Sequence, residues 1–329
     1  MSAPQQASNL PVASGLARMR QRLPRVQHGG ALLALAALLL FNIAATDRFV
    51  SLQTFNVNLT QVTTIVIVGV GMTLVIATAG IDLSVGSLMA IAGTLAPMLF
   101  GRIAGAAGVA LAIVLPMAAT WACGWFNGWM ITRYAIQPIV ATLVLFIAGR
   151  GVAQVMTGGN LQTFSHPGFA WLGTGYLAGI PFQVWLMLGI VAACAWVLHR
   201  TVFGRYLVAT GSSDRAARLT GIPAARIKRH VYALSGALAG LAGLITVSIN
   251  SSSDANLVGL GMELDAIAAV AVGGTLLTGG RASVVGTLIG ALIIQLTRYT
   301  MLAHGVPDAA ALVVKAAIII LAVWVQARR

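Results

Sequence analysis

The sequence predicts an all-α integral membrane protein, and three observations support this class. The chain of 329 residues is 58% hydrophobic and 8% charged, whereas soluble domains carry about 25% charged residues. Apolar runs of about the length needed to cross a bilayer recur along it. Basic residues gather in the short segments between these runs, where the positive-inside rule places cytoplasmic residues.

The N-terminal segment, residues 1–29, is polar and basic, and we expect it to form a flexible cytoplasmic tail. The apolar run 31–45 follows it directly. A basic segment followed by such a run is also typical of a cleaved signal peptide. Because many further apolar runs follow, an uncleaved first helix is the simpler prediction. We therefore expect residues 30–329 to form one transmembrane domain.

We predict about ten transmembrane helices, with the N-terminus and the C-terminus both in the cytoplasm. This orientation places fifteen of the twenty lysines and arginines on the inner side. Arg150, Arg298 and Lys315 fall inside or at the ends of predicted spans, where we expect them to pair or to extend toward the interface. The predicted spans are 31–46, 60–79, 84–100, 107–131, 138–157, 183–199, 230–249, 263–279, 283–303 and 309–326.

The longest inner loop, residues 200–229, carries the signals of a short helix. Ser212 or Ser213 can cap its start, Asp214 suits the first turn, and Gly221 ends it. We expect this helix to lie on the cytoplasmic face.

The sequence also contains an internal repeat. Residues 82–95 align without gaps with residues 263–276, and Asp82 then corresponds to Glu263. In the predicted topology the link before the first stretch faces inward and the link before the second faces outward. The repeat therefore predicts two inverted halves, an arrangement common in transport proteins, whose path runs between the halves.

Several kinds of chemistry are not indicated. There is no GxxxxGK[ST] loop, and neither of the two lysines follows a glycine, so any ATPase that powers this protein is another chain. The five histidines are scattered, and we expect no metal site, no cofactor and no catalytic residue. The net charge of +13 is not gathered in a basic domain, so no nucleic-acid partner is expected.

A carboxylate stands out in the stretch GIDLSVGS, at Asp82. A bare carboxylate in lipid costs about 2.5–3.5 kcal/mol, so Asp82 should face water, hydrogen-bond donors or a helix N-terminus. Because it directly precedes a predicted helix, we expect it to cap the N–H groups of residues 84–85. Glu263 and Asp265 have the same relation to a predicted helix over 266–279. Direct contact with a substrate is the alternative.

Other polar residues near span ends complete the candidate set. Each is more often an interhelical hydrogen-bonding group than a ligand for substrate. The candidates for a translocation path or helix junction are Asp82, Ser84, Asn127, Gln137, Glu263 and Asp265.

Four long segments together resemble the permease subunits of bacterial ABC sugar importers, in the ribose, xylose, arabinose and galactofuranose branch. They are GMTLVIATAGIDLSVGSLMAIAG (71–93), IQPIVATLVLFIAGRGVAQ (136–154), GRYLVATGSSDRAARLTGIPAARIK (204–228) and ELDAIAAVAVGGTLLTGGRASVVGTLIGALII (263–294). The wording around RGVAQ and ELDAI is most similar to galactofuranose permeases.

The resemblance implies a transport subunit, not an enzyme, in the bacterial inner membrane. Its partners would be membrane lipid, an ABC ATPase, a periplasmic sugar-binding protein and a second permease chain, in a homodimer or a heterodimer. The coupling helix that contacts the ATPase would comprise Ser213, Asp214, Arg215, Ala216, Ala217, Arg218, Leu219, Thr220 and Gly221.

Two alternatives remain within transport. Branched-chain amino-acid permeases of ABC importers carry a similar motif, although the IDLSVG wording favours sugar. An ATP-independent secondary carrier would need ionisable groups in mid-span, and here the acidic candidates lie at span ends. A membrane scaffold that moves nothing is a third class.

Overall fold

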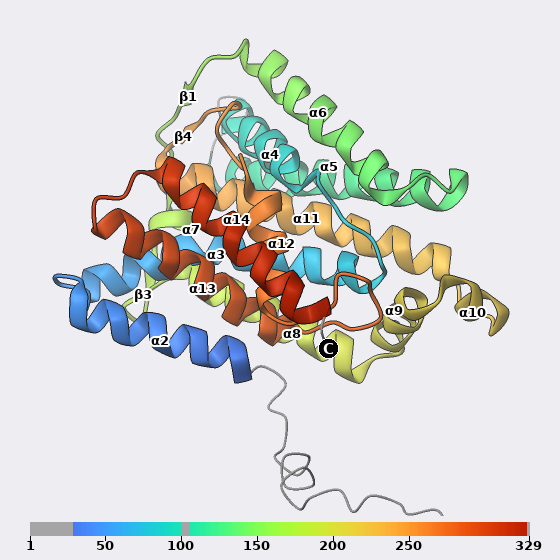
Figure 1. Cartoon of the computed structure of the whole chain (residues 1–329). Coiled ribbons are helices and arrows are strands. Elements are labelled where there is room, and N and C mark those ends of the chain that lie inside the picture. Colours follow the sequence, from blue (N-terminus) through green and yellow to red (C-terminus); the bar gives the residue numbers. More distant parts are fainter. Residues whose placement is uncertain (1–28, 101–104, 328–329) are drawn as a thin grey trace, which may run out of the picture.

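The computed structural model describes residues 29–100 and 105–327 and shows an elongated bundle of helices (Figure 1). The predicted tail therefore lies outside the described residues, apart from Gly29. The helices of the first part of the chain are α2 (Gly29–Ala45), α3 (Leu52–Ala77), α4 (Val85–Phe100), α5 (Gly105–Tyr134), α6 (Pro138–Thr157), α7 (Pro167–Thr174) and α8 (Phe182–Arg200). Those that follow are α9 (Val202–Ser212), α10 (Asp214–Leu219), α11 (Ala224–Asn250), α12 (Met262–Val272), α13 (Val284–Ala303) and α14 (Asp308–Ala327).

Each predicted span contains a helix, but the helices differ in length. Six of those in the described part of the chain are long and apolar enough to cross a membrane, namely α3, α5, α6, α8, α11 and α13. The helices α2 and α4 and the segment Ala309–Ile318 of α14 are apolar but shorter. The all-α membrane class is thus supported, whereas six helices, not ten, meet the length and composition of a span.

The predicted span 263–279 is wrong in its second half. The helix α12 ends at Val272, and residues 273–283 form an irregular link. The reason is Gly274, whose φ of +86° is a left-handed conformation that ends helices. With 11 residues, α12 is about 16 Å long at 1.5 Å per residue, about half of a bilayer core.

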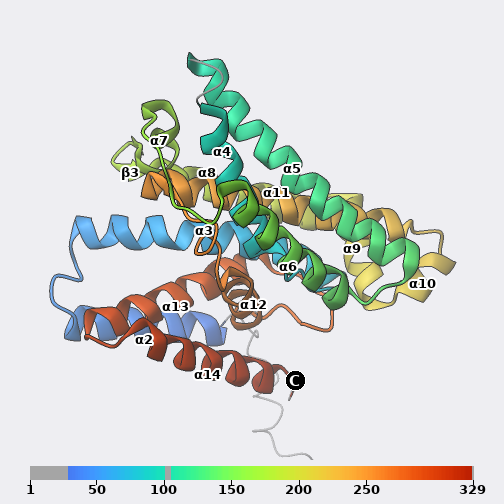
Figure 2. The same ribbon diagram turned by 90° about the horizontal axis from the view of Figure 1, so that it is seen from above.

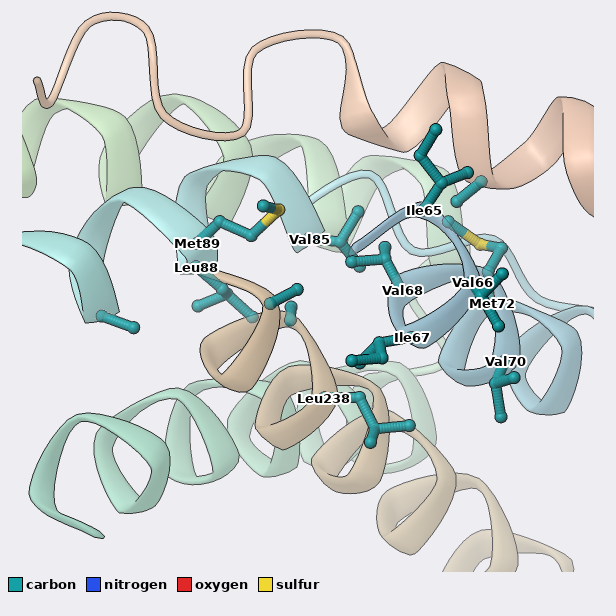
Figure 3. Close-up of a cluster of buried hydrophobic side chains, with 14 of the residues drawn as sticks. Ile65, Val66, Ile67, Val68, Val70, Met72, Val85, Leu88, Met89 and Leu238 are labelled. Carbon is teal, nitrogen blue, oxygen red and sulfur yellow. The ribbon is translucent and has the colours of Figure 1, made fainter. Parts of the chain in front are cut away.

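Two long helices, α3 and α11, form the centre of the bundle and run antiparallel to each other (Figure 2). The direction follows from their contacts, because Gly71 of α3 lies against Ser235 of α11, while Gly80, just beyond α3, lies against Tyr232. Every residue of α3 from Val62 to Ala77 is buried, as expected for a helix that is hydrophobic on all sides. Figure 3 shows part of this core, with side chains of α3 near Leu238 of α11 and Met89 of α4.

Each central helix packs mainly against helices from the other half of the chain. We call the two sets of helices the first group (α3–α6) and the second group (α11–α14). Apart from α11 itself, α3 packs chiefly against α12 and α13 of the second group. Conversely, α11 packs chiefly against α4 and α5 of the first group. Each group therefore supplies a central helix that is covered by the other group.

Two glycines of α5 bring this helix close to α11. A Cβ atom on Gly124 of α5 would overlap the carbonyl oxygen of Tyr232, and one on Gly128 would lie 2.7 Å from the Cα atom of Arg229. This GxxxG spacing places both glycines on one helix face and lets the backbones approach closely.

Four two-residue strands lie at the end of the bundle opposite α9 and α10 (Figure 1). The strand β1 (Gln162–Thr163) pairs antiparallel with β4 (Ser252–Ser253), and Gln162 is opposite Ser253. The strands β2 (Tyr176–Leu177) and β3 (Ile180–Pro181) form a tight hairpin. The glycine-rich segment between α6 and α8 is thus partly ordered by its own helix, α7, and by these pairings.

The close approach of α5 and α11 predicts that Gly124→Ala lowers the thermal unfolding midpoint in detergent. The added methyl group meets backbone, so it should cost about 1–3 kcal/mol, as overpacking does. Gly189→Ala in α8 is the matched control, because a Cβ atom there has nothing within 4 Å. It should leave the midpoint unchanged or raise it, since alanine favours helix over glycine. Equal midpoints for both variants would contradict the prediction.

Candidate functional site

The link between α3 and α4 carries Asp82, which is fully buried. Its Oδ1 atom accepts hydrogen bonds from the backbone N–H of Ser84 at 3.1 Å and from the Ser84 hydroxyl at 2.5 Å. Its Oδ2 atom accepts a hydrogen bond from the hydroxyl of Ser235 in α11 at 2.8 Å. The carboxylate therefore joins the start of α4 to the central helix α11.

The same link is held by three further side chains from three helices. Asn127 of α5 donates from its Nδ2 atom to the Ser84 hydroxyl at 3.2 Å. The hydroxyls of Thr142 in α6 and Tyr232 in α11 both donate to the carbonyl oxygen of Ile81, each at 3.4 Å. Four helices thus meet at one short polar segment, which we call the Asp82 network.

Three of the six predicted path or junction residues, Asp82, Ser84 and Asn127, come together in this network. The expected N–H donor at residue 84 is present. Gln137 lies apart, at the exposed start of α6, and makes no side-chain cap there. Ser235 was not among the predicted site residues, because a serine inside an apolar helix carries no charge and commonly bonds to a carbonyl group of its own helix. The feature of the sequence that could have indicated this role is a hydroxyl group within the run of small residues in α11.

Contrary to the prediction, Glu263 and Asp265 do not cap α12. They lie inside its first turn, where acids suit the helix dipole, and the N-cap residue is Gly261. Asp265 instead forms an ion pair with Lys315 of α14, which confirms that this lysine pairs within the bundle. Glu263 is buried, and its Oε2 atom lies beside Gly86 of α4.

Arg150 of α6, which the sequence places inside a span, binds backbone carbonyl groups. Its Nη1 atom donates to the oxygens of Ala255 at 2.8 Å and Val258 at 2.6 Å, and its Nη2 atom donates to Gly86 at 3.3 Å. The guanidinium group therefore fastens α6 to α4 and to the link that precedes α12, within reach of the Glu263 charge.

At the other candidate site the structure contains the predicted short helix, α10. Ser213 is its N-cap, and the Ser213 hydroxyl accepts a hydrogen bond from the Ala216 N–H at 3.2 Å. Asp214 stands in the first turn, and Gly221, with φ of +81°, follows the C-cap residue Thr220. The local signals in this loop were therefore sufficient to place the helix.

Most of α10 is exposed at the end of the bundle beside α9 (Figure 2). Leu219 is 81% exposed, whereas Ala217 is only 4% exposed and packs inward. Asp214 pairs with Arg218 at 2.9 Å and with Lys228 of α11 at 3.0 Å. Partial burial raises the pKa of Asp214, but the hydrogen bond and charge of Lys228, together with Arg218, outweigh this effect and hold the pKa below its usual value.

The fold and these two sites together indicate the class of protein. Long apolar helices surround a buried central pair, polar links lie deep in the bundle, and a capped helix projects at one end. In the described part of the chain no three histidine, cysteine, aspartate or glutamate side chains gather as a metal site would require. This is the architecture of a multi-pass membrane protein with a short exposed helix at one end.

Comparison with known proteins identifies the family. The profile described as the permease component of the branched-chain amino acid transport system matches residues 55–323, and the chain belongs to this family. The ribose import permease of Escherichia coli K12 is 43% identical over 304 residues, which cover 91% of this chain and 93% of the relative. No solved structure matches the chain significantly.

Other relatives are also named for sugars. The galactofuranose transporter permease of Escherichia coli K12 is 42% identical over 80% of this chain and 77% of the relative. The L-arabinose permease of Azospirillum brasilense is 34% identical over 80% of this chain and 77% of the relative. These relatives are transport subunits, and together with the six apolar helices they indicate a multi-pass protein of the bacterial inner membrane.

The Asp82 network predicts a graded response to substitution. Asp82→Asn retains one acceptor oxygen for Ser84, and its amide can donate to the Ser235 hydroxyl. Asp82→Ala leaves buried donors without an acceptor, and each such donor lowers the free energy of unfolding by about 1–3 kcal/mol. Asp82→Ala should therefore lower the thermal midpoint more than Asp82→Asn, and Ser235→Ala should lower it least. Equal losses for both Asp82 variants would show that the charge, not the hydrogen bonding, is required.

Proposed function

We propose that the chain is the transmembrane permease subunit of an ABC importer that carries a monosaccharide across the inner membrane. The observation that carries this proposal is the similarity to sugar import permeases over most of the chain, up to 91% of it. A separate ATPase powers the transport, and a periplasmic binding protein delivers the sugar. A second permease chain, identical or similar, completes the path.

The proposed topology has ten helices in two inverted repeats, with both termini in the cytoplasm. Two observations support it. The central helices α3 and α11 run antiparallel, as equivalent helices of inverted repeats must, and each is covered by the opposite group of helices. The outer side is then the end with the short strands and α7, and α9 and α10 lie on the cytoplasmic side.

The Asp82 network has a structural role beside the path in this proposal. Both carboxylate oxygens already accept hydrogen bonds from protein groups, so little capacity is left for a sugar hydroxyl. We assign Asp82 the role of holding the start of α4 against α11, and Asn127 and Ser84 the role of supporting it. The path itself needs only weak contacts, because a sugar must leave it as readily as it enters.

Uptake by the complete importer in proteoliposomes tests the function. We expect ATP-dependent uptake of one sugar from a panel of D-ribose, D-galactose, D-fructose and L-arabinose, delivered by the cognate binding protein. Leucine serves as the amino-acid control and should not accumulate. Uptake of leucine, but of no sugar, would favour the amino-acid alternative. Uptake by this chain alone, without ATPase, would show a secondary carrier.

Docking of the ATPase on α10 is tested by Leu219→Asp. An exposed leucine on a projecting helix can insert into an apolar groove of a partner, as helices docked in grooves do, and a charge there should sharply reduce co-purification of the ATPase. The variant should fold normally, since Leu219 is 81% exposed. Leu161→Asp is the control, because Leu161 is 57% exposed near β1 at the opposite end. Unchanged co-purification with Leu219→Asp would contradict docking at this residue.

A further inference from the structure

Three chain segments meet by backbone contact at the cytoplasmic end of the bundle. They are the end of α9, the last residues of α3 with the beginning of the link to α4, and the loop between α12 and α13. The N–H of Gly280 in that loop donates to the carbonyl oxygen of Ala77 at 3.1 Å. A Cβ atom on Gly211 of α9 would overlap the same Ala77 oxygen and would lie 2.8 Å from the Gly280 nitrogen.

The conformations at this meeting point are unusual. Gly279 and Gly280 have φ of +89° and +76°, and Ala79 has φ of +59°, a left-handed value that is unfavourable for alanine. A Cβ atom on Gly279 would lie 2.8 Å from the Cβ atom of Ala79 and 2.9 Å from the oxygen of Gly211. The three segments therefore contact one another chiefly through backbone atoms and the Cβ atom of Ala79, and the Ser212 side chain lies beside Gly280.

The residues at this meeting point are close in sequence to the candidate functional segments. Gly211 lies two residues before Ser213, the N-cap of α10. Ala79 lies three residues before Asp82, whose network holds the start of α4. Gly279 and Gly280 follow α12, which carries Glu263 and Asp265. A movement of α10 therefore reaches, through backbone contacts, the link that carries Asp82 and the loop that follows α12.

We propose that this glycine junction, formed by Ala77, Ala79, Gly211, Gly279 and Gly280, transmits the movement of α10 to the Asp82 network and to α12. Gly211 is then a positioning residue for coupled transport, acting through the backbone of Ala77. The inference rests on the proposed function, in which an ATPase moves α10.

Two variants change the junction in opposite ways. Gly211→Ala forces the end of α9 away from Ala77. Ala79→Gly removes an unfavourable left-handed alanine together with its contact to Gly279, so it loosens the junction without adding bulk. Gly189→Ala in α8, where nothing lies within 4 Å of the added atom, is the matched control.

The decisive measurement is the number of sugar molecules moved per ATP hydrolysed, in proteoliposomes, with the sugar of the panel above that the wild-type importer accumulates. We expect this ratio to fall at least about fivefold in both junction variants, the lower end of typical coupling between sites. Co-purification of the ATPase should remain at the wild-type level. A purely structural role would reduce the amount of assembled importer but leave the ratio unchanged.

The outcomes separate this inference from the function on which it rests. If both variants assemble and keep the wild-type ratio, the junction proposal is overturned while ATPase docking stands. If Gly211→Ala fails to fold, the ratio measured with Ala79→Gly decides alone. If no ATPase binds the wild-type chain, the proposed function fails first and the inference falls with it.

Discussion

A carboxylate deep in an apolar bundle needs hydrogen-bond donors, and this need determines how the central helices are arranged. Asp82 accepts from a backbone N–H and from two serine hydroxyls, and hydrogen bonds to charged acceptors are among the stronger ones in proteins. Because one of those hydroxyls is on α11, the start of α4 cannot shift without leaving buried polar groups unpaired. The helix crossing is therefore fixed by polar chemistry as well as by packing.

Small residues allow this polar centre to be so compact. Gly80 faces Tyr232 closely enough that a Cβ atom would overlap the phenol oxygen. Along α5, Gly124 and Gly128 bring the backbone of α11 into contact, which lets Asn127 reach the Ser84 hydroxyl. In lipid, where apolar side chains gain little by clustering, such close backbone contact supplies much of the association energy.

Sequence reasoning succeeded where the signal was local and failed where it depended on distant contacts. The capped helix α10 was predictable because Ser213, Asp214 and Gly221 lie within nine residues of one another. The early end of α12 was not, because hydropathy does not register the left-handed conformation of Gly274. The partnership of Asp82 with Ser235 joins residues 153 positions apart, and no single-sequence pattern announces such a pair.

Because each central helix packs against the other group, the order of synthesis affects how the bundle assembles. The helix α3 emerges early in synthesis, yet α12 and α13, which cover much of it, are made about 200 residues later, roughly 10–40 s at typical elongation rates. During that interval the most enclosed helix of the native bundle must stand in lipid or in the insertion machinery without its permanent neighbours. The first group therefore does not mature as an independent unit, and assembly of the core waits for the last part of the chain.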